Sequence, residues 1–148
     1  AREVQNIVLE KILHEGNSQS ALAYVRRIIS KLDKREINRE KLIIKTQLRK
    51  GLDEYLSESP HVTVAKKMIQ SGIPVDSGML IEYFIAESRE KNTLIRDRAR
   101  LPDEKGEYDL EYYKEHQILP AVENIFAVFG ISMEEILHGS KQKKIFEF

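Results

Sequence analysis

One stretch of the sequence, 107–130, constrains the fold more than any other part of the chain. Its apolar residues recur at steps of three to five, which is the spacing of one face of a long helix. These residues are Leu110, Tyr113, Ile118, Val122, Ile125, Phe126 and Phe129. Asp109 can cap the first turn with its carboxylate, and Gly130 can end the helix in the left-handed conformation. The sequence therefore predicts a long helix that packs against a core.

Pro120 lies inside this predicted helix. It has no N–H to donate to the carbonyl of His116, and its ring crowds that carbonyl. We therefore expect the helix to bend at Pro120 and to leave the carbonyl free. Taken alone, the stretch is most simply interpreted as a kinked core helix.

The first forty residues predict a helical hairpin. One amphipathic helix covers 3–15, and Gly16 ends it. Asn17 and Ser18 can cap a second helix. Its apolar stripe consists of Leu22, Val25, Ile28, Ile29 and Leu32. Five basic residues, Arg26, Arg27, Lys31, Lys34 and Arg35, lie mostly outside that stripe and are most simply a solvated face.

The middle of the chain has a different pattern. The run 42–44 is apolar and β-branched, as in a strand, and 45–51 follows as a polar, basic edge. Pro60 opens a helix that Gly72 ends, with Val62, Ala65, Met68 and Ile69 inward. A second, more buried strand is predicted at 79–86 and a short one around 98–101. The fold class is therefore α+β, a mainly helical base with a small α/β tip insertion.

Composition limits the possible functions. The chain has 148 residues, 41% of them hydrophobic and 32% charged, which suits one soluble domain with a modest core. No apolar run approaches a membrane span, and no signal peptide is visible. The absence of cysteine excludes disulfides and thiolate zinc sites. The four histidines have no close metal-binding spacing, so we expect no metal.

The formal net charge is zero, but it is unevenly distributed, since the middle of the chain is basic and the end is acidic. An isolated nucleic-acid module usually has a stronger basic excess, so composition alone argues mildly against DNA binding. A local basic face remains compatible with this balance.

A more specific pattern is carried by particular residues. In the stretch 107–130 these residues are Tyr108-Asp109, Glu111-Tyr112-Tyr113, Gln117 and Leu119-Pro120-Ala121-Val122. In the middle they are Lys41-Leu42-Ile43-Ile44, Gln47, Tyr55, Pro60-His61-Val62, Val64-Ala65-Lys66, Gly72, Gly78-Met79, Ile81, Tyr83 and Asp97-Arg98-Ala99. In this order they resemble the thumb of archaeal-type family-B DNA polymerases, over essentially the whole chain.

The resemblance implies a single thumb domain over 1–138, with a helical base (1–38 and 106–138) and an α/β tip (40–105). Polymerase chemistry needs carboxylates that hold two metal ions about 4 Å apart. In the family these carboxylates belong to the palm, where Mg²⁺ is expected. The candidate carboxylates here, Asp97, Asp103, Glu104 and Asp109, belong to a predicted turn and helix start, where capping and solvation explain them. We therefore expect this chain to be part of a nucleotidyltransferase. We expect it to hold no cofactor and to be inactive when it is isolated from the palm.

A thumb binds duplex DNA mainly through phosphates and the minor groove. By the resemblance, the nucleic-acid-binding residues are Gln47, Arg49, Lys50, His61, Lys66, Arg98, Tyr112 and His116. Simpler explanations exist for single residues. Lys66 could be merely solvated, and His61 could cap its helix. Tyr112 could be a core residue with a solvated hydroxyl, and Arg98 could pair with Asp97 or Asp103. His116 and Arg49 depart from the family pattern, which often has Asn and a small hydroxyl residue there.

The end of the chain carries two patterns. Ser132 to Glu135 is a capping box that starts a short helix through Leu137. In the tail, 139–148, three residues fall at the first, fourth and seventh places of a pattern that looks like the clamp-interacting peptide of replication proteins: Gln142, Ile145 and Phe148. The residue at the eighth place of this pattern, which is usually aromatic or aliphatic, is absent. The alternative is a frayed hydrophobic end.

The sequence thus predicts the thumb portion of a replicative family-B polymerase. Its expected partners are primer–template duplex DNA, the palm and remaining polymerase domains, and the sliding clamp, with no membrane and a cytoplasmic location. A noncatalytic protein-interaction subunit that contacts no DNA is an alternative, and a separate DNA-binding adaptor is a third, although no helix-turn-helix or zinc signature supports it. Salt-dependent duplex binding separates the first two.

Overall fold

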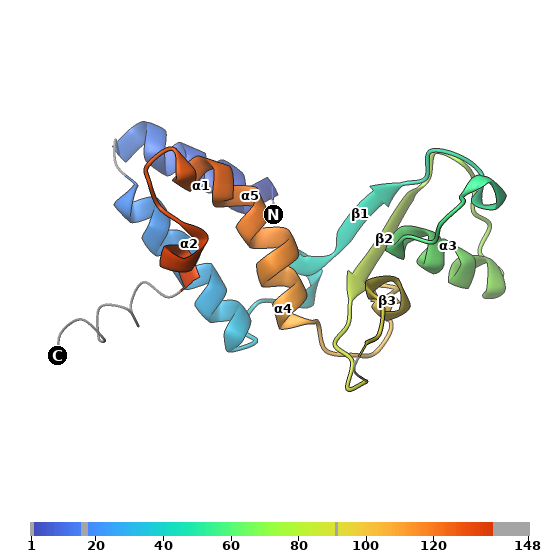
Figure 1. The fold of residues 1–148 in the computed structure, drawn as a ribbon. Coiled ribbons are helices and arrows are strands. Elements are labelled where there is room, and N and C mark those ends of the chain that lie inside the picture. The colour runs from blue at the N-terminus through green and yellow to red at the C-terminus, as the bar shows by residue number, and fades with distance from the viewer. Residues whose placement is uncertain (1, 16–17, 91, 138–148) are drawn as a thin grey trace. The chain divides into compact units, whose positions relative to one another are not determined.

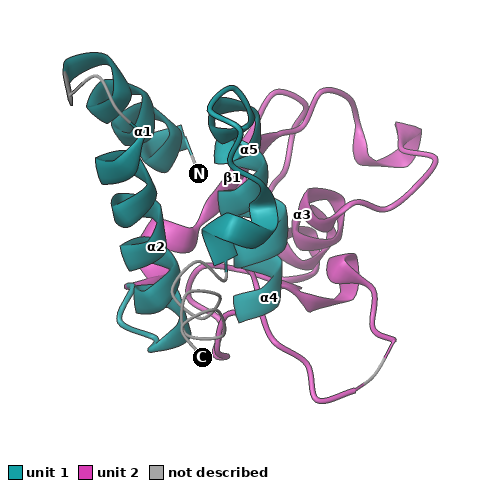
Figure 2. Cartoon of the chain, turned by 60° about the vertical axis from the view of Figure 1, so that its left-hand side comes forward, with its two compact units in different colours: residues 1–37, 110–148 teal, residues 38–109 magenta. Residues whose placement is uncertain are grey.

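The computed structural model describes residues 2–15, 18–90 and 92–137 (Figure 1). The chain divides into two compact units, coloured separately in Figure 2. The helical unit comprises Ala1–Ile37 and Leu110–Phe148, and the sheet unit comprises Asn38–Asp109. The first unit is helical, and the second combines a three-stranded antiparallel sheet with a helix, which confirms the predicted α+β class.

The helical unit is built from α1 (Arg2–Glu15), α2 (Gln19–Asp33), α4 (Leu110–Tyr112), a π-helix (Tyr113–Ile118) and α5 (Leu119–Ala127), followed by a short helix at 133–137. Helix α1 packs against both α2 and α5 (Figure 1). The buried apolar residues of this unit are Val8, Ala21, Leu22, Val25, Ile29, Leu32, Tyr113, Ile118, Leu119, Val122, Phe126 and Ile136. The predicted stripe of α2 is therefore confirmed as a core face, with Ile28 half-buried at its edge.

The helix predicted around Pro120 is interrupted by the π-helix that directly precedes it. The Leu119 N–H donates to the carbonyl of Lys114, five residues earlier instead of four. A wider turn of this kind accommodates a residue that cannot donate and whose ring crowds the preceding turn. The sequence predicts a bend at Pro120, whereas the structure has a change in helical register over the residues before it.

Phe129 is a correction to the predicted core stripe. Its side chain is 44% exposed, because α5 ends at Ala127 and Phe129 belongs to the turn that follows. Gly130 has φ of 72°, and its N–H donates to the Ala127 carbonyl at 3.0 Å while the Ile131 N–H donates to the Phe126 carbonyl at 3.1 Å. This pair of bonds is a Schellman motif, which confirms the predicted left-handed stop.

Helix α2 ends in the same motif without glycine. The Glu36 N–H donates to the Lys31 carbonyl at 2.9 Å, and the Arg35 N–H donates to the Leu32 carbonyl at 3.0 Å. Arg35 therefore occupies the left-handed position, with φ of 56°. At the other end, Ser18 precedes α2 but makes no side-chain capping bond, so the predicted cap by its hydroxyl is wrong.

The sheet unit contains β1 (Ile44–Gln47), β2 (Leu80–Ile85) and β3 (Ala99–Arg100) in the order β1-β2-β3, with α3 (Pro60–Gln70) packed against β2 and β3. Both strand pairs are antiparallel, with Ile44 opposite Tyr83 and Ile85 opposite Ala99. The buried apolar residues are Leu48, Val62, Val64, Ala65, Ile81, Tyr83, Phe84, Ile85, Ala86, Ala99 and Tyr108. The core of this unit lies between α3 and the sheet.

Two local predictions for the sheet unit are wrong. The first strand begins at Ile44, because Arg39–Leu42 forms a 3₁₀ turn that Asn38 caps by accepting the Glu40 N–H at 3.3 Å. In α3, Ile69 is 49% exposed in the last turn of the helix. The second buried strand, the short third strand and the start of α3 at Pro60 agree with prediction.

The first and last segments of the sheet unit are joined by Arg39. Its guanidinium donates from Nη1 to the Gly106 carbonyl at 3.0 Å and from Nη2 to the Pro102 carbonyl at 3.1 Å. The same group lies 4.5 Å from the centroid of the buried Phe84 ring. Arg39 thus closes the unit where the chain enters and leaves it, through hydrogen bonds and a cation–π contact.

Candidate nucleic-acid interface

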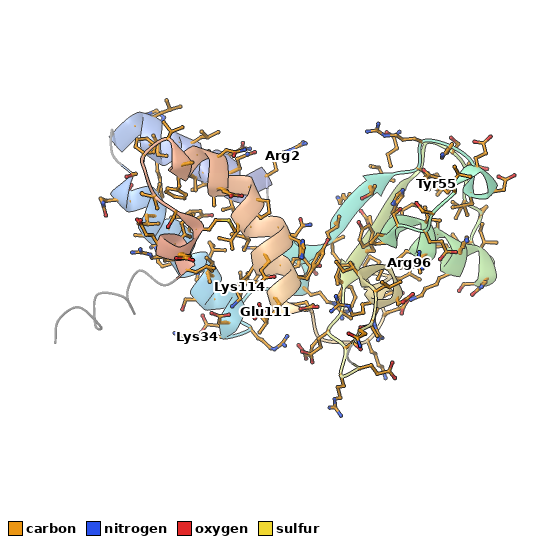
Figure 3. All side chains as sticks on the ribbon, viewed as in Figure 1. Arg2, Lys34, Tyr55, Arg96, Glu111 and Lys114 are labelled. Carbon is orange, nitrogen blue, oxygen red and sulfur yellow. The ribbon has the colours of Figure 1, made fainter. Side chains whose placement is uncertain are left out.

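The predicted site residues belong to both units. Six lie in the sheet unit, namely Gln47, Arg49, Lys50, His61, Lys66 and Arg98, and two in the helical unit, Tyr112 and His116. Within the sheet unit, three of the six gather around an aromatic residue that the sequence analysis did not assign to the site. That residue is Tyr55, labelled in Figure 3 in the loop after β1.

Three contacts converge on Tyr55. Its hydroxyl oxygen accepts the Arg49 backbone N–H at 3.1 Å. The Lys50 Nζ lies 4.9 Å from the ring centroid, and the His61 ring meets the tyrosine ring edge-on, with centroids 5.7 Å apart and planes at 85°. We call these four residues the Tyr55 cluster. It brings the Lys50 ammonium and the Arg49 backbone together with an imidazole from the start of α3.

His61 occupies the second position of α3, directly after Pro60. Its Nδ1 lies 2.7 Å from the Ser59 hydroxyl oxygen, so that hydroxyl is engaged with the imidazole and makes no capping bond to the helix. Burial lowers the pKa of His61 from its ordinary value. The imidazole is therefore neutral at neutral pH and offers a polar contact to a ligand.

Arg49 and Lys50 are the exposed cations of the cluster. Their loop also contains Asp53 and Glu54, but the Glu54 carboxylate accepts the Gly51 N–H at 3.2 Å. In the part of the chain that the structure describes, no carboxylate pairs with the side chain of Arg49 or of Lys50. Neither cation is held in an ion pair there, so the donor groups of both remain available for contacts to phosphate.

Lys66 and Arg98 have acidic partners. Lys66 pairs with Glu58, and this hydrogen bond lowers the pKa of that carboxyl group. Arg98 pairs with Asp109, so the alternative partners suggested by sequence, Asp97 and Asp103, are wrong. Backbone pairing explains the difference, because the Asp109 N–H donates to the Ile85 carbonyl at 3.0 Å, next to β3. Only 19% of the Arg98 side chain is exposed.

Gln47 is exposed at the end of β1, and its Nε2 donates to the Gly78 carbonyl at 3.1 Å. In the helical unit, the Tyr112 and His116 rings stack with centroids 5.3 Å apart and planes at 24°. The Tyr112 hydroxyl accepts from Gln117 Nε2 at 3.2 Å. Tyr112 is half-buried and His116 is exposed, so the stack presents the imidazole to solvent.

Two further properties concern the described residues only. No group of three or more His, Asp or Glu side chains among them could hold a metal ion. No helix in the same part of the chain is long and apolar enough to cross a membrane. The predicted clamp-binding residues Gln142, Ile145 and Phe148 lie outside the described residues.

Exposed cations beside aromatic and imidazole rings are suited to binding an anionic polymer such as a nucleic acid. Comparison with known proteins assigns the chain as a whole to a family. The model of "DNA polymerase family B" matches residues 1–129, and the chain belongs to that family.

Individual relatives agree with this assignment. The chain is 38% identical over 149 aligned positions to a DNA polymerase of Thermococcus sp. (strain 9oN-7), covering 98% of this chain and 19% of the relative. It is 40% identical over 149 positions to a DNA polymerase of Pyrococcus horikoshii, covering 98% of this chain and 12% of that protein. The structure of the family B DNA polymerase from Pyrobaculum calidifontis matches with a TM-score of 0.73 and 32% identity, over 88% of this chain and 18% of that one. The chain thus spans less than a fifth of these relatives.

Proposed function

We propose that this chain is the thumb portion of a replicative family-B DNA polymerase, which grips primer–template duplex DNA without sequence preference. The observation that carries the proposal is the Tyr55 cluster, where Arg49 and Lys50 are exposed without acidic partners in the described part of the chain. Similarity to polymerases along nearly the whole chain supports it.

Phosphate contacts fit this role because a replicative enzyme must hold any sequence. Phosphates carry no sequence information, so cations that bind them position the duplex without selecting it. Arg49 offers a planar set of donors and Lys50 a compact charge, while His61 and Gln47 add polar contacts for phosphate or minor-groove atoms. In the helical unit, the exposed imidazole of His116 provides a further polar group.

Nucleotide addition belongs to another part of the enzyme in this proposal. The chain corresponds to 19% or less of the relatives compared above, so most of their length lies elsewhere. Carboxylates in that remainder, by the resemblance the palm, would hold the Mg²⁺ ions that activate the primer hydroxyl and stabilise the leaving pyrophosphate. The thumb portion would then supply binding and no catalytic group.

We further propose that the tail, 139–148, binds a second partner, the sliding clamp. Gln142, Ile145 and Phe148 would fill a surface pocket of the sliding clamp with a polar anchor, an aliphatic and an aromatic side chain, on a short helix induced by binding. Lys141, Lys143 and Lys144 would assist the encounter.

The test is duplex binding by the full chain, measured by fluorescence anisotropy of a labelled primer–template over a range of NaCl concentrations. We expect weak binding that does not depend on sequence, with a log–log salt slope of about −0.9 per phosphate neutralised. The double variant Arg49→Gln/Lys50→Gln should flatten the slope by about 1.8, because two phosphate contacts are lost.

The matched control is Lys31→Gln/Lys34→Gln, which removes two exposed positive charges from the last turn of α2 and the residue after it and should leave the slope unchanged. Equal effects of the two variants would mean that only net charge matters and that the Tyr55 cluster is not the contact. A wild-type chain that binds no duplex would instead favour a protein-interaction subunit.

A further inference from the structure

We infer that Tyr55 is a positioning residue for the phosphate contacts, acting through the Lys50 ammonium and the Arg49 backbone that it contacts. This inference rests on the proposed function, and it assigns a role that exposure and charge alone would not give to a tyrosine. The ring of Tyr55 positions the Lys50 ammonium, and its hydroxyl positions the Arg49 backbone.

The backbone explains why this loop needs a positioning group. Leu48 is 1% exposed, its N–H donates to the Met79 carbonyl at 2.9 Å, and its carbonyl accepts the Gly78 N–H at 2.7 Å. These are the last bonds that join this segment to the neighbouring strand. Arg49 lies beyond them, and its N–H is bound instead by the Tyr55 hydroxyl. The tyrosine thus continues the anchoring of the chain past the end of the sheet.

Tyr55 is itself held on two sides. Its N–H donates to the Leu52 carbonyl at 3.4 Å, at the end of a 3₁₀ turn that is closed by the bond from the Glu54 N–H to the Gly51 carbonyl at 3.0 Å. The His61 ring meets the Tyr55 ring at nearly a right angle from the first turn of α3, a helix that packs against the sheet. The tyrosine therefore connects the loop to the rigid part of the unit.

The effect on binding follows from preorganisation. A lysine on a flexible loop loses rotamer freedom when it binds phosphate, and a lysine already held over a ring loses less. The ring can bias Lys50 toward its binding conformation by no more than the strength of their contact. For an exposed cation–π contact this corresponds to about two- to fivefold in affinity.

The experiment measures duplex affinity and salt slope for Tyr55→Leu and Tyr55→Phe in the full chain. Tyr55→Leu removes both ring and hydroxyl and should weaken binding by about five- to tenfold. Tyr55→Phe keeps the ring that holds Lys50 and should recover most of that loss, to within about threefold of wild type. Circular dichroism and melting curves establish that each variant is folded.

The two arms of a double-mutant cycle distinguish positioning from a general loosening of the structure. In the Arg49→Gln/Lys50→Gln background, Tyr55→Leu should cost less than about 1.5-fold, because the groups through which it acts are gone. In a Lys66→Gln background it should keep its full cost, since Lys66 pairs with Glu58 and does not contact the tyrosine.

The possible outcomes separate this inference from the proposed function. If the wild-type chain binds duplex with the expected slope but a folded Tyr55→Leu variant binds equally well, the inference fails and the proposed function stands. The same conclusion follows if Tyr55→Leu costs as much in the Arg49→Gln/Lys50→Gln background as in wild type. If the wild-type chain shows no salt-dependent binding, both fail.

Discussion

We predict that the Pro120→Ala variant keeps the π-helix at Tyr113–Ile118, although it removes the residue that cannot donate. The reason is the direction in which the side chains point. In an uninterrupted α-helix each residue turns by about 100°, so Tyr113 and Val122, nine positions apart, would lie about 180° apart. Both are buried. The π-helix contains one extra residue in its wider turn, so Tyr113 and Val122 are separated by the rotation of eight residues instead of nine. The angle between them about the helix axis falls to about 80°, and both side chains can reach one core.

The energies favour the π-helix in the variant. Returning to α-helical register would recover one hydrogen bond, from the new backbone N–H at position 120 to the His116 carbonyl, which contributes about 1 kcal/mol. It would also rotate Tyr113, now 2% exposed, by about 100° away from the core. Losing the burial of a large side chain costs about 2 to 3 kcal/mol. Burial therefore outweighs the recovered bond by about 1 to 2 kcal/mol.

The assay is NMR of the full chain, using ring contacts of Tyr113 to buried methyl groups and the backbone hydrogen-bond pattern of 113–119. The matched variant combines Pro120→Ala with deletion of the exposed Glu115, which shortens the step from Tyr113 to Ile118 to four residues. That variant should form a continuous α-helix and keep Tyr113 buried. A Pro120→Ala single variant that turns α-helical and exposes Tyr113 would refute the reasoning.

Three further predictions follow from the chain. Arg35→Gly should raise the free energy of unfolding by about 1 kcal/mol, because Arg35 has a left-handed backbone, whereas Lys34→Gly, in ordinary backbone, should lower it; urea denaturation that ranks them the other way would contradict this. The isolated chain should incorporate no nucleotide when it is given primer, template and Mg²⁺, and incorporation abolished by replacing one of its acidic residues would contradict the proposed division of roles. In the complete polymerase, deleting 142–148 should remove clamp-stimulated processivity and leave basal DNA affinity nearly unchanged, and persistent stimulation would rule out the clamp motif.

The sequence contains a signal for the π-helix in the spacing of its apolar residues. The apolar steps around Pro120 are mostly three or four, but the step from Tyr113 to Ile118 is five. The structure places the π-helix over these same residues. A step of five inside an otherwise regular stripe is therefore informative, because a side chain five positions on returns to the same face only if the turn widens. The periodicity of an α-helix alone does not reveal the π-helix, because a single step of five is accepted as part of the same face.

Other features depended on tertiary contacts that sequence patterns do not show. The start of β1 was misplaced because an apolar run continued into a 3₁₀ turn, and only the pairing of Ile44 with Tyr83 sets the strand register. The basic character of Arg49 and Lys50 was visible in the sequence. Their arrangement around Tyr55 was not, because it requires a loop to fold back and bring a residue six positions later onto Arg49.

The zero net charge of the chain is compatible with phosphate binding because the charges of the sheet unit are unequally compensated. Its described residues include the ion pairs of Lys45 with Glu82, Lys66 with Glu58, Lys67 with Glu104, and Arg98 with Asp109. A close pair contributes little potential beyond its own dimensions, and at physiological salt a phosphate responds mainly to charges within about 8 Å. Arg49 and Lys50 have no such partner in the described part of the chain, so their donor groups remain available to a phosphate near Tyr55. Composition averages over these differences, so a neutral chain can still hold a polyanion locally, weakly and with a strong dependence on salt.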